Sequence, residues 1–198
     1  MTSGAVPEPT FYFDFNSPYA YLAAHRVDRM LGVPVQWQPI AFAFVIRALD
    51  RTPWSFTDAR PAGMRECEER ALRYGLPELR WPPGWPAESY ALAPLRAALI
   101  AEEDGRLREF SLAAFEENFV HGTGVREDGA LERAAEIAGV DPAAIRDGIE
   151  RPEIKQRLRE ATDGALAAGV QGVPTVLVDG ETFWGDDRLE AAAARLAA

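Results

Sequence analysis

The N-terminal part of the chain alternates between short apolar runs and one stretch with helical character. Residues 11–15 are mostly aromatic, and so short an apolar run predicts a buried strand. Ser17 followed by Pro18 predicts a helix start, because serine caps the first turn and proline needs no N–H there. Gly32 predicts the end of that helix, and residues 33–40 alternate with the period of a second strand. This order within about 30 residues predicts a βαβ unit.

The middle of the chain has the pattern of helices throughout. Alanine is frequent, arginine alternates with glutamate, and apolar side chains recur at the spacing of one helix face. Asp141–Pro142 and Arg151–Pro152 each predict a helix start. Residues 81–86 contain three prolines and a glycine and therefore predict a loop. Because no segment here predicts a strand, we expect an all-helical insertion.

The C-terminal segment returns to mixed structure. Residues 173–178 form an apolar run typical of a strand, Asp179–Gly180 predicts a hairpin turn, and residues 181–184 predict the returning strand. Residues 185–188 then open a final helix that is rich in alanine. The order βαβ, helices, αββα predicts an α/β protein.

The domain organisation follows from this order. We expect residues 10–41 and 166–198 to form one domain, and residues 42–165 to form a helical subdomain inserted into it. A length of 198 residues suits one domain with a large insertion.

Composition and charge exclude several classes of function. The chain has 21 basic and 31 acidic residues, a net charge of −10, which disfavours nucleic acid and anionic membranes as partners. Its single cysteine, Cys67, excludes an internal disulfide, a dithiol redox pair and a cysteine-based zinc site. Because only His25 and His121 remain as histidine ligands, we expect no metal. The first residues lack the basic-then-apolar order of a signal peptide, so a cytoplasmic location is expected.

Three motifs resemble those of a known group of proteins. Residues 14–21 (DFNSPYAY), 172–175 (GVPT) and 183–189 (FWGDDRL) resemble the DsbA-like superfamily, in particular its 2-hydroxychromene-2-carboxylate isomerases and kappa-class glutathione transferases. The resemblance extends from about residue 10 to the end, and the helical middle is only generically similar. It implies a thioredoxin-like fold with a large helical insertion, glutathione as cofactor, and a homodimer.

The resemblance implies that Ser17, with Pro18 beside it, faces the sulfur of glutathione. In redox members of the superfamily Ser17 and Ala20 would both be cysteines, so dithiol exchange is excluded in this chain. A helix start favours a thiolate, and the Ser17 hydroxyl can stabilise one. The alternative is that Ser17 is only a helix cap.

The same resemblance assigns the C-terminal motifs to glutathione. It implies that Val173, before a cis Pro174, pairs its backbone with the cysteinyl part, and that Asp186 or Asp187 holds the ammonium of the γ-glutamyl end. The alternatives are a trans proline at an edge strand and acidic residues that only favour the start of a helix.

The loop near residue 50 departs from the family pattern, in which an asparagine is expected. Asp50 can stand in its place, and Arg47, Arg51 and Arg60 are candidate partners for a carboxylate of substrate or glutathione. The alternative is that each arginine is a solvated surface charge.

These features lead to three hypotheses for the function. The first is a glutathione-dependent isomerase of a small aromatic or conjugated carboxylate, with Ser17 as catalytic residue. The second is a kappa-class-like glutathione transferase, and the third is a redox-inactive, DsbA-like peptide-binding module. The aromatic residues Trp81, Trp85 and those of 110–119 suit a core or a dimer contact, and some of them can also wall an aromatic pocket.

Overall fold

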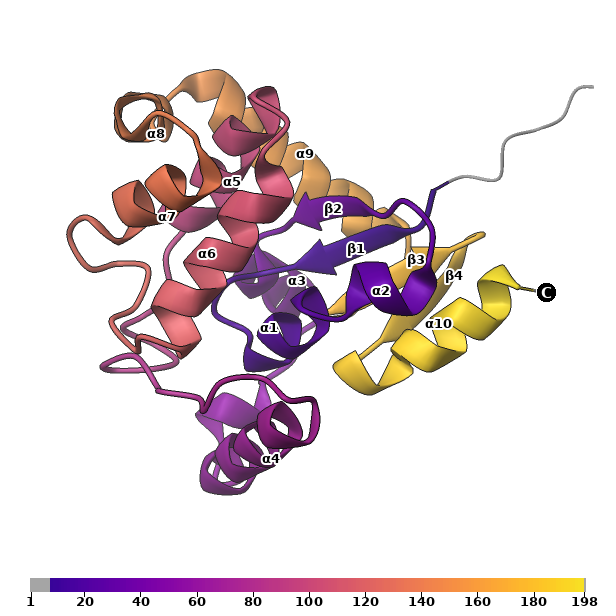
Figure 1. Cartoon of the computed structure of the whole chain (residues 1–198). Coiled ribbons are helices and arrows are strands. Elements are labelled where there is room, and N and C mark those ends of the chain that lie inside the picture. The colour runs from indigo at the N-terminus through magenta and orange to yellow at the C-terminus, as the bar shows by residue number, and fades with distance from the viewer. Residues whose placement is uncertain (1–7, 198) are drawn as a thin grey trace, which may run out of the picture.

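Four short strands form one mixed sheet in the computed structural model, which describes residues 8–197. They are β1 (Thr10–Phe13), β2 (Gln36–Pro39), β3 (Thr175–Val178) and β4 (Glu181–Trp184), in the order β2-β1-β3-β4 (Figure 1). β1 and β2 are parallel, whereas β3 is antiparallel to both of its neighbours. The predicted hairpin at Asp179–Gly180 is confirmed, because it joins β3 to β4.

Side chains of β1 alternate between the two faces of the sheet, as the pleat requires. Phe11 and Phe13 are fully buried and pack on Trp37 of β2, with ring centroids 5.0 and 5.6 Å apart. Tyr12 belongs to a second, smaller apolar cluster that includes Ile40. The sheet is therefore covered on both faces.

Helices from the two ends of the chain and from the insertion supply this cover. Figure 1 shows α2 and α10 in front of the sheet and α9 behind it. Their bounds, with those of the two helices that adjoin them, are α1 (Pro18–Ala24), α2 (Val27–Leu31), α3 (Phe42–Ala48), α9 (Pro152–Ala167) and α10 (Leu189–Leu196).

The predicted first helix begins and ends where the sequence places it, but it is interrupted. Ser17 caps α1, and Gly32 ends α2 with a positive φ of 66° that glycine adopts without strain. Between them the chain turns at Arg26, whose φ of −125° is not helical. The Arg26 guanidinium binds the Asp186 carbonyl at 3.0 Å and the Glu190 carboxylate at 2.9 Å, contacts that no local pattern shows.

The segment 42–167, which runs to the end of α9 and thus two residues beyond the predicted boundary at 165, folds into helices and loops. Besides α3 and α9 it holds η1 (Trp54–Phe56), α4 (Arg60–Arg73), α5 (Ala93–Glu103), α6 (Leu107–Phe119), α7 (Ala130–Ala138) and α8 (Pro142–Gly148). The helix starts at Pro142 and Pro152 and the loop at 81–86 are confirmed. The final helix starts later than predicted, because residues 186–188 form the 3-10 turn η2 (Asp186–Arg188) before α10. The whole arrangement confirms the thioredoxin-like fold with helical additions.

Within residues 8–197 no helix is long and apolar enough to cross a membrane. The same residues contain no group of three or more histidine, cysteine, aspartate or glutamate side chains arranged to hold a metal ion.

Candidate active site

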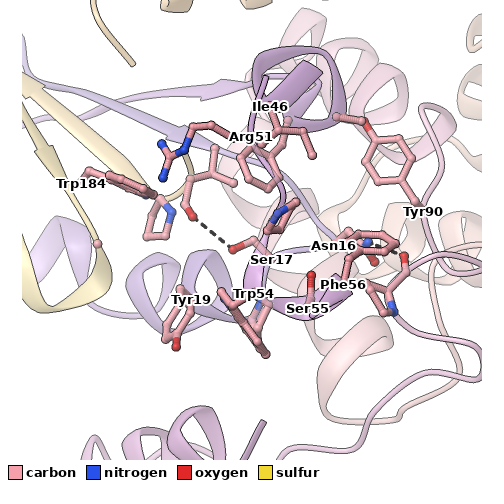
Figure 2. A pocket seen from close by; sticks show the side chains of 18 of the residues that line it. Asn16, Ser17, Tyr19, Ile46, Arg51, Trp54, Ser55, Phe56, Tyr90 and Trp184 are labelled. Carbon is pink, nitrogen blue, oxygen red and sulfur yellow. Dashed lines mark hydrogen bonds between the residues drawn. The ribbon is translucent and has the colours of Figure 1, made fainter. Parts of the chain in front are cut away.

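A cavity of about 730 Å³ opens between one end of the sheet and the helices and loops of residues 42–90. Its wall is built from the β1–α1 loop, the loop before β3, the β4–η2 turn, α3 and η1 (Figure 2). Seven of the residues predicted for the site line it, from segments far apart in the sequence: Ser17, Pro18, Arg51, Val173, Pro174, Asp186 and Asp187.

Ser17 faces both the helix and the cavity. Its Oγ accepts a hydrogen bond from the Ala20 N–H at 3.2 Å, which is the bond of a helix cap. The hydroxyl also donates to the Val173 carbonyl at 3.3 Å, and Figure 2 marks this bond. The capping role is therefore real, and the same oxygen also touches the segment before Pro174. Because α1 has only seven residues and Pro18 has no N–H, its dipole alone does not make an anion site.

The loop that carries Ser17 is held by buried polar contacts. The Asp14 carboxylate accepts from the Asn16 N–H at 2.9 Å and from the Phe42 N–H at 3.0 Å, which ties the end of β1 to α3. Burial raises the pKa of Asp14 to about 6, although these two donors oppose the shift. Asn118 in α6 donates to the Phe15 carbonyl at 2.7 Å.

The loop 81–90 of the insertion completes this support. The Asn16 amide donates to the Pro86 carbonyl at 2.8 Å and accepts from the Ser89 hydroxyl at 2.7 Å. The Trp85 indole N–H donates to the Asn16 carbonyl at 3.0 Å. With both ends of its amide paired, Asn16 fixes the residue that precedes Ser17.

Val173 presents its backbone to the cavity. The Val173–Pro174 bond is cis, as the resemblance implies. The Val173 carbonyl accepts from Ser17, and its N–H donates to no protein acceptor within residues 8–197. Gly172 lets Trp184 pack on this segment, since a Cβ there would lie 2.5 Å from the indole ring. A ligand with an extended backbone can therefore pair here.

The two adjacent aspartates behave differently. Asp186 is buried, and its carboxylate accepts from Arg70 at 2.6 Å and from the Tyr74 hydroxyl at 3.0 Å. Burial raises the pKa of Asp186, and the Arg70 charge opposes that rise. The Asp187 side chain is 57% exposed and lies 3.6 Å from Arg70. Asp187 is thus the carboxylate available to a ligand, whereas Asp186 positions Arg70.

Arg51 brings a positive charge to the cavity wall without a carboxylate partner among residues 8–197. It donates to the Gln171 carbonyl at 3.1 Å, and its guanidinium lies 4.6 Å from the centre of the Trp184 ring. Arg70 also lines the cavity, but its charge is matched by Asp186, Glu66 and Asp187. Arg51 is the cation that can receive a ligand carboxylate.

The remaining predicted residues do not line the cavity. Arg47 is exposed on α3, and Asp50 is an exposed turn residue with a φ of 49°. Arg60 donates to the Trp85 carbonyl, so it supports the wall from behind. We do not retain these three as binding residues.

Apolar side chains that the sequence did not single out form most of the wall. They come from α3, η1 and the 81–90 loop: Phe42, Ile46, Trp54, Phe56 and Tyr90. Trp85 also lines the cavity and packs against Trp81 in a tilted arrangement, with ring centroids 4.5 Å apart. Phe110, Phe115 and Phe119 lie in the core, as predicted. The cavity therefore offers an aromatic compartment beside Ser17.

Comparison with known proteins places this geometry in a family. Residues 10–197 match the family described as the DsbA-like thioredoxin domain. The chain belongs to this family. Among curated proteins, a 2-hydroxychromene-2-carboxylate isomerase from Sphingobium xenophagum is 30% identical over 186 residues, 91% of this chain and 93% of the relative. A second isomerase of that name, from Pseudomonas sp. strain C18, is 29% identical over 90% of this chain and 85% of its own length.

Solved structures of the DsbA-like family share the fold. A 2-hydroxychromene-2-carboxylate isomerase superposes with a TM-score of 0.83 at 23% identity, covering 96% of both chains. A probable DsbA oxidoreductase from Streptomyces coelicolor gives 0.73 at 20% identity, with 96% and 88% covered. This chain lacks the sulfur that dithiol exchange needs, because Cys67 is its single cysteine. Cys67 is also buried, and burial raises the pKa of its thiol to about 12.

Proposed function

We propose that this protein is a glutathione-dependent isomerase of a 2-hydroxychromene-2-carboxylate-type substrate. The proposal is supported by relatives of that name that align along nearly the whole chain. The observation that carries it is the position of Ser17. Its hydroxyl lies in the cavity wall, bonded to the Val173 carbonyl, beside an aromatic compartment of suitable size for a bicyclic carboxylate.

The residues around Ser17 fit glutathione. The free Val173 N–H and its carbonyl suit the peptide backbone of the tripeptide, and the exposed Asp187 carboxylate suits its ammonium group. When bound, glutathione supplies a thiol that adds reversibly to a conjugated carbon. The task of this chain is then to hold that thiol and the substrate in contact.

Ser17 is the donor for the sulfur in this proposal. Its hydroxyl donates to the Val173 carbonyl, and rotation about the Cβ–Oγ bond lets it donate to the sulfur of bound glutathione instead. A hydrogen bond to an ionised acceptor is about twice as strong as one between neutral groups, so this change favours the thiolate.

Arg51 and the aromatic wall hold the substrate. Arg51 forms an ion pair with the substrate carboxylate, for which its planar guanidinium is well shaped. Phe42, Ile46 and Trp85 exclude water from the ring system. In this proposal the substrate lies between Arg51 and Tyr90.

The test is an assay with 2-hydroxychromene-2-carboxylate, with and without glutathione, followed by absorbance and by titration of free thiol. We expect interconversion with the ring-opened isomer only when glutathione is present, and full recovery of glutathione. Consumption of one glutathione per product would instead identify a transferase. No conversion under either condition would refute the proposal.

A further inference from the structure

Ser55 is a second hydroxyl in the wall of the cavity. It lies in η1 and is only 8% exposed. Ser55 lines the cavity, and Figure 2 shows its hydroxyl directed toward the side where Ser17 and Asn16 lie. Within residues 8–197 its hydroxyl forms no hydrogen bond, and its oxygen is not one of the fully buried unpaired atoms, so it is open to the cavity.

The local turn does not need this hydroxyl. Thr57, two residues later, donates to the Trp54 carbonyl at 2.8 Å and accepts from the Ala59 N–H at 3.3 Å. These bonds cap the turn that joins η1 to α4. Ser55 thus carries a hydroxyl with no structural partner that is accessible from the cavity, where a ligand or water can bind it.

The chemistry of a serine hydroxyl in an uncharged turn favours one kind of ligand atom. Its neighbours in η1 are the aromatic residues Trp54 and Phe56, and no charged side chain of η1 accompanies it. A serine hydroxyl both donates and accepts a hydrogen bond and carries no charge. It therefore suits an uncharged oxygen, while Arg51 suits a carboxylate.

We propose that Ser55 is a substrate-binding residue whose hydroxyl pairs with the uncharged oxygen on carbon 2 of the substrate. This inference rests on the proposed function. Carbon 2 of a 2-hydroxychromene-2-carboxylate carries a hydroxyl when the ring is closed and a carbonyl oxygen when it is open. A hydroxyl that can both accept and donate a hydrogen bond binds that oxygen in either form. It would therefore hold carbon 2 in place while the ring opens and closes.

Binding of two probes in the absence of glutathione tests the inference. Benzylidenepyruvate has a carboxylate, a carbonyl at carbon 2 and an alkene conjugated with it, and 4-phenylbut-3-enoate has a CH2 group in place of that carbonyl. Isothermal titration calorimetry of the wild type should show about tenfold tighter binding of benzylidenepyruvate, the effect of one net hydrogen bond. Ser55→Ala should lose this preference, and Ser55→Thr should restore most of it.

Ser111→Ala is the matched control, because Ser111 is also a buried serine without a partner but lies in α6, away from the cavity. It should keep the full preference. A Ser55→Ala protein that still prefers benzylidenepyruvate, or a wild type that binds both probes equally or neither, would overturn the inference. The proposed function fails separately, in the isomerisation assay, so the two failures are distinguishable.

Discussion

At the scale of single residues, buried polar groups do most to define the cavity, and each has a measurable consequence. Asp14, Asp186 and Ser17 are all less than one tenth exposed, and each side chain forms at least one hydrogen bond that connects segments distant in the sequence. Asp14 links β1 to α3, Asp186 links η2 to α4, and Ser17 links α1 to the segment before β3. Substitutions at these residues should show which of them act on the free energy of unfolding and which act on ligand binding.

Asp14 should make stability depend on pH. Burial raises its pKa from 3.8 to about 6, so the folded state favours the protonated form. Its contribution to the free energy of unfolding is therefore full below about pH 4 and is lost as the pH rises through 6. Relative to Asp14→Asn, which stays neutral, the wild type should lose about 3 kcal/mol between these limits. Urea unfolding of both proteins at several pH values measures this loss. If the free energies of unfolding of the two proteins changed in parallel with pH, the prediction would be wrong.

The same substitution should affect stability much more at Asp186 than at Asp187. Asp187→Asn removes an exposed carboxylate, so it should weaken glutathione binding while changing the free energy of unfolding by less than about 0.5 kcal/mol. Asp186→Asn leaves the half-buried Arg70 without its strongest partner, so it should cost roughly 2 kcal/mol or more of stability. Chemical unfolding and glutathione titration of both variants check this pair. Equal effects on stability would show that the division of roles is wrong.

At the scale of elements, α4 carries the single thiol on its buried face. Cys67 is inaccessible, and burial raises its pKa to about 12. We therefore expect its reaction with Ellman's reagent at pH 8 to be slow in the native protein and to become fast in 6 M guanidinium chloride. Rapid modification of the folded protein would mean that α4 opens from the core.

Local signals in the sequence are sufficient to predict most of the helices, strands and turns. Ser17 with Pro18, Gly32 and Asp179–Gly180 act through the backbone of their own few residues, so their effects could be predicted. The break at Arg26 could not, because it depends on Asp186 and Glu190, about 160 residues away.

The candidate site was predictable only where its motifs are local. Ser17, Val173 and Asp187 stand in short motifs, and the structure brings them to one cavity. Arg70 and Ser55 were not found, since a charged helix and an isolated serine give no signal of what they face. Arg51 and Arg47 look equivalent in sequence, and only the turn after α3 places Arg51 in the wall.

At the scale of the whole molecule, the family resemblance leads us to expect a homodimer. Phe44 and Leu49 are exposed apolar side chains near α3, and Ile137 is another on α7. Light scattering coupled to size-exclusion chromatography should therefore give twice the monomer mass of 21.8 kDa. A mass of one chain at micromolar concentration would contradict this expectation.

The central claim is that the folded protein brings a glutathione thiol to Ser17 and stabilises its ionised form. If Ser17 were only a helix cap, Ser17→Ala would cost about 0.5–2 kcal/mol of stability and leave turnover unchanged. If it also donates to the thiolate, turnover should fall by roughly 10²-fold. Ser111→Ala again serves as the control for loss of a buried hydroxyl.

The most direct measurement is the pKa of the glutathione thiol in complex with the protein, followed by the ultraviolet absorbance of the thiolate as the pH is varied. The wild type should lower that pKa below the value of free glutathione, since Ser17 donates to the ionised sulfur. The Ser17→Ala complex should return it toward the free value. A thiol pKa that is the same in both complexes would show that Ser17 only caps α1 and would contradict the account.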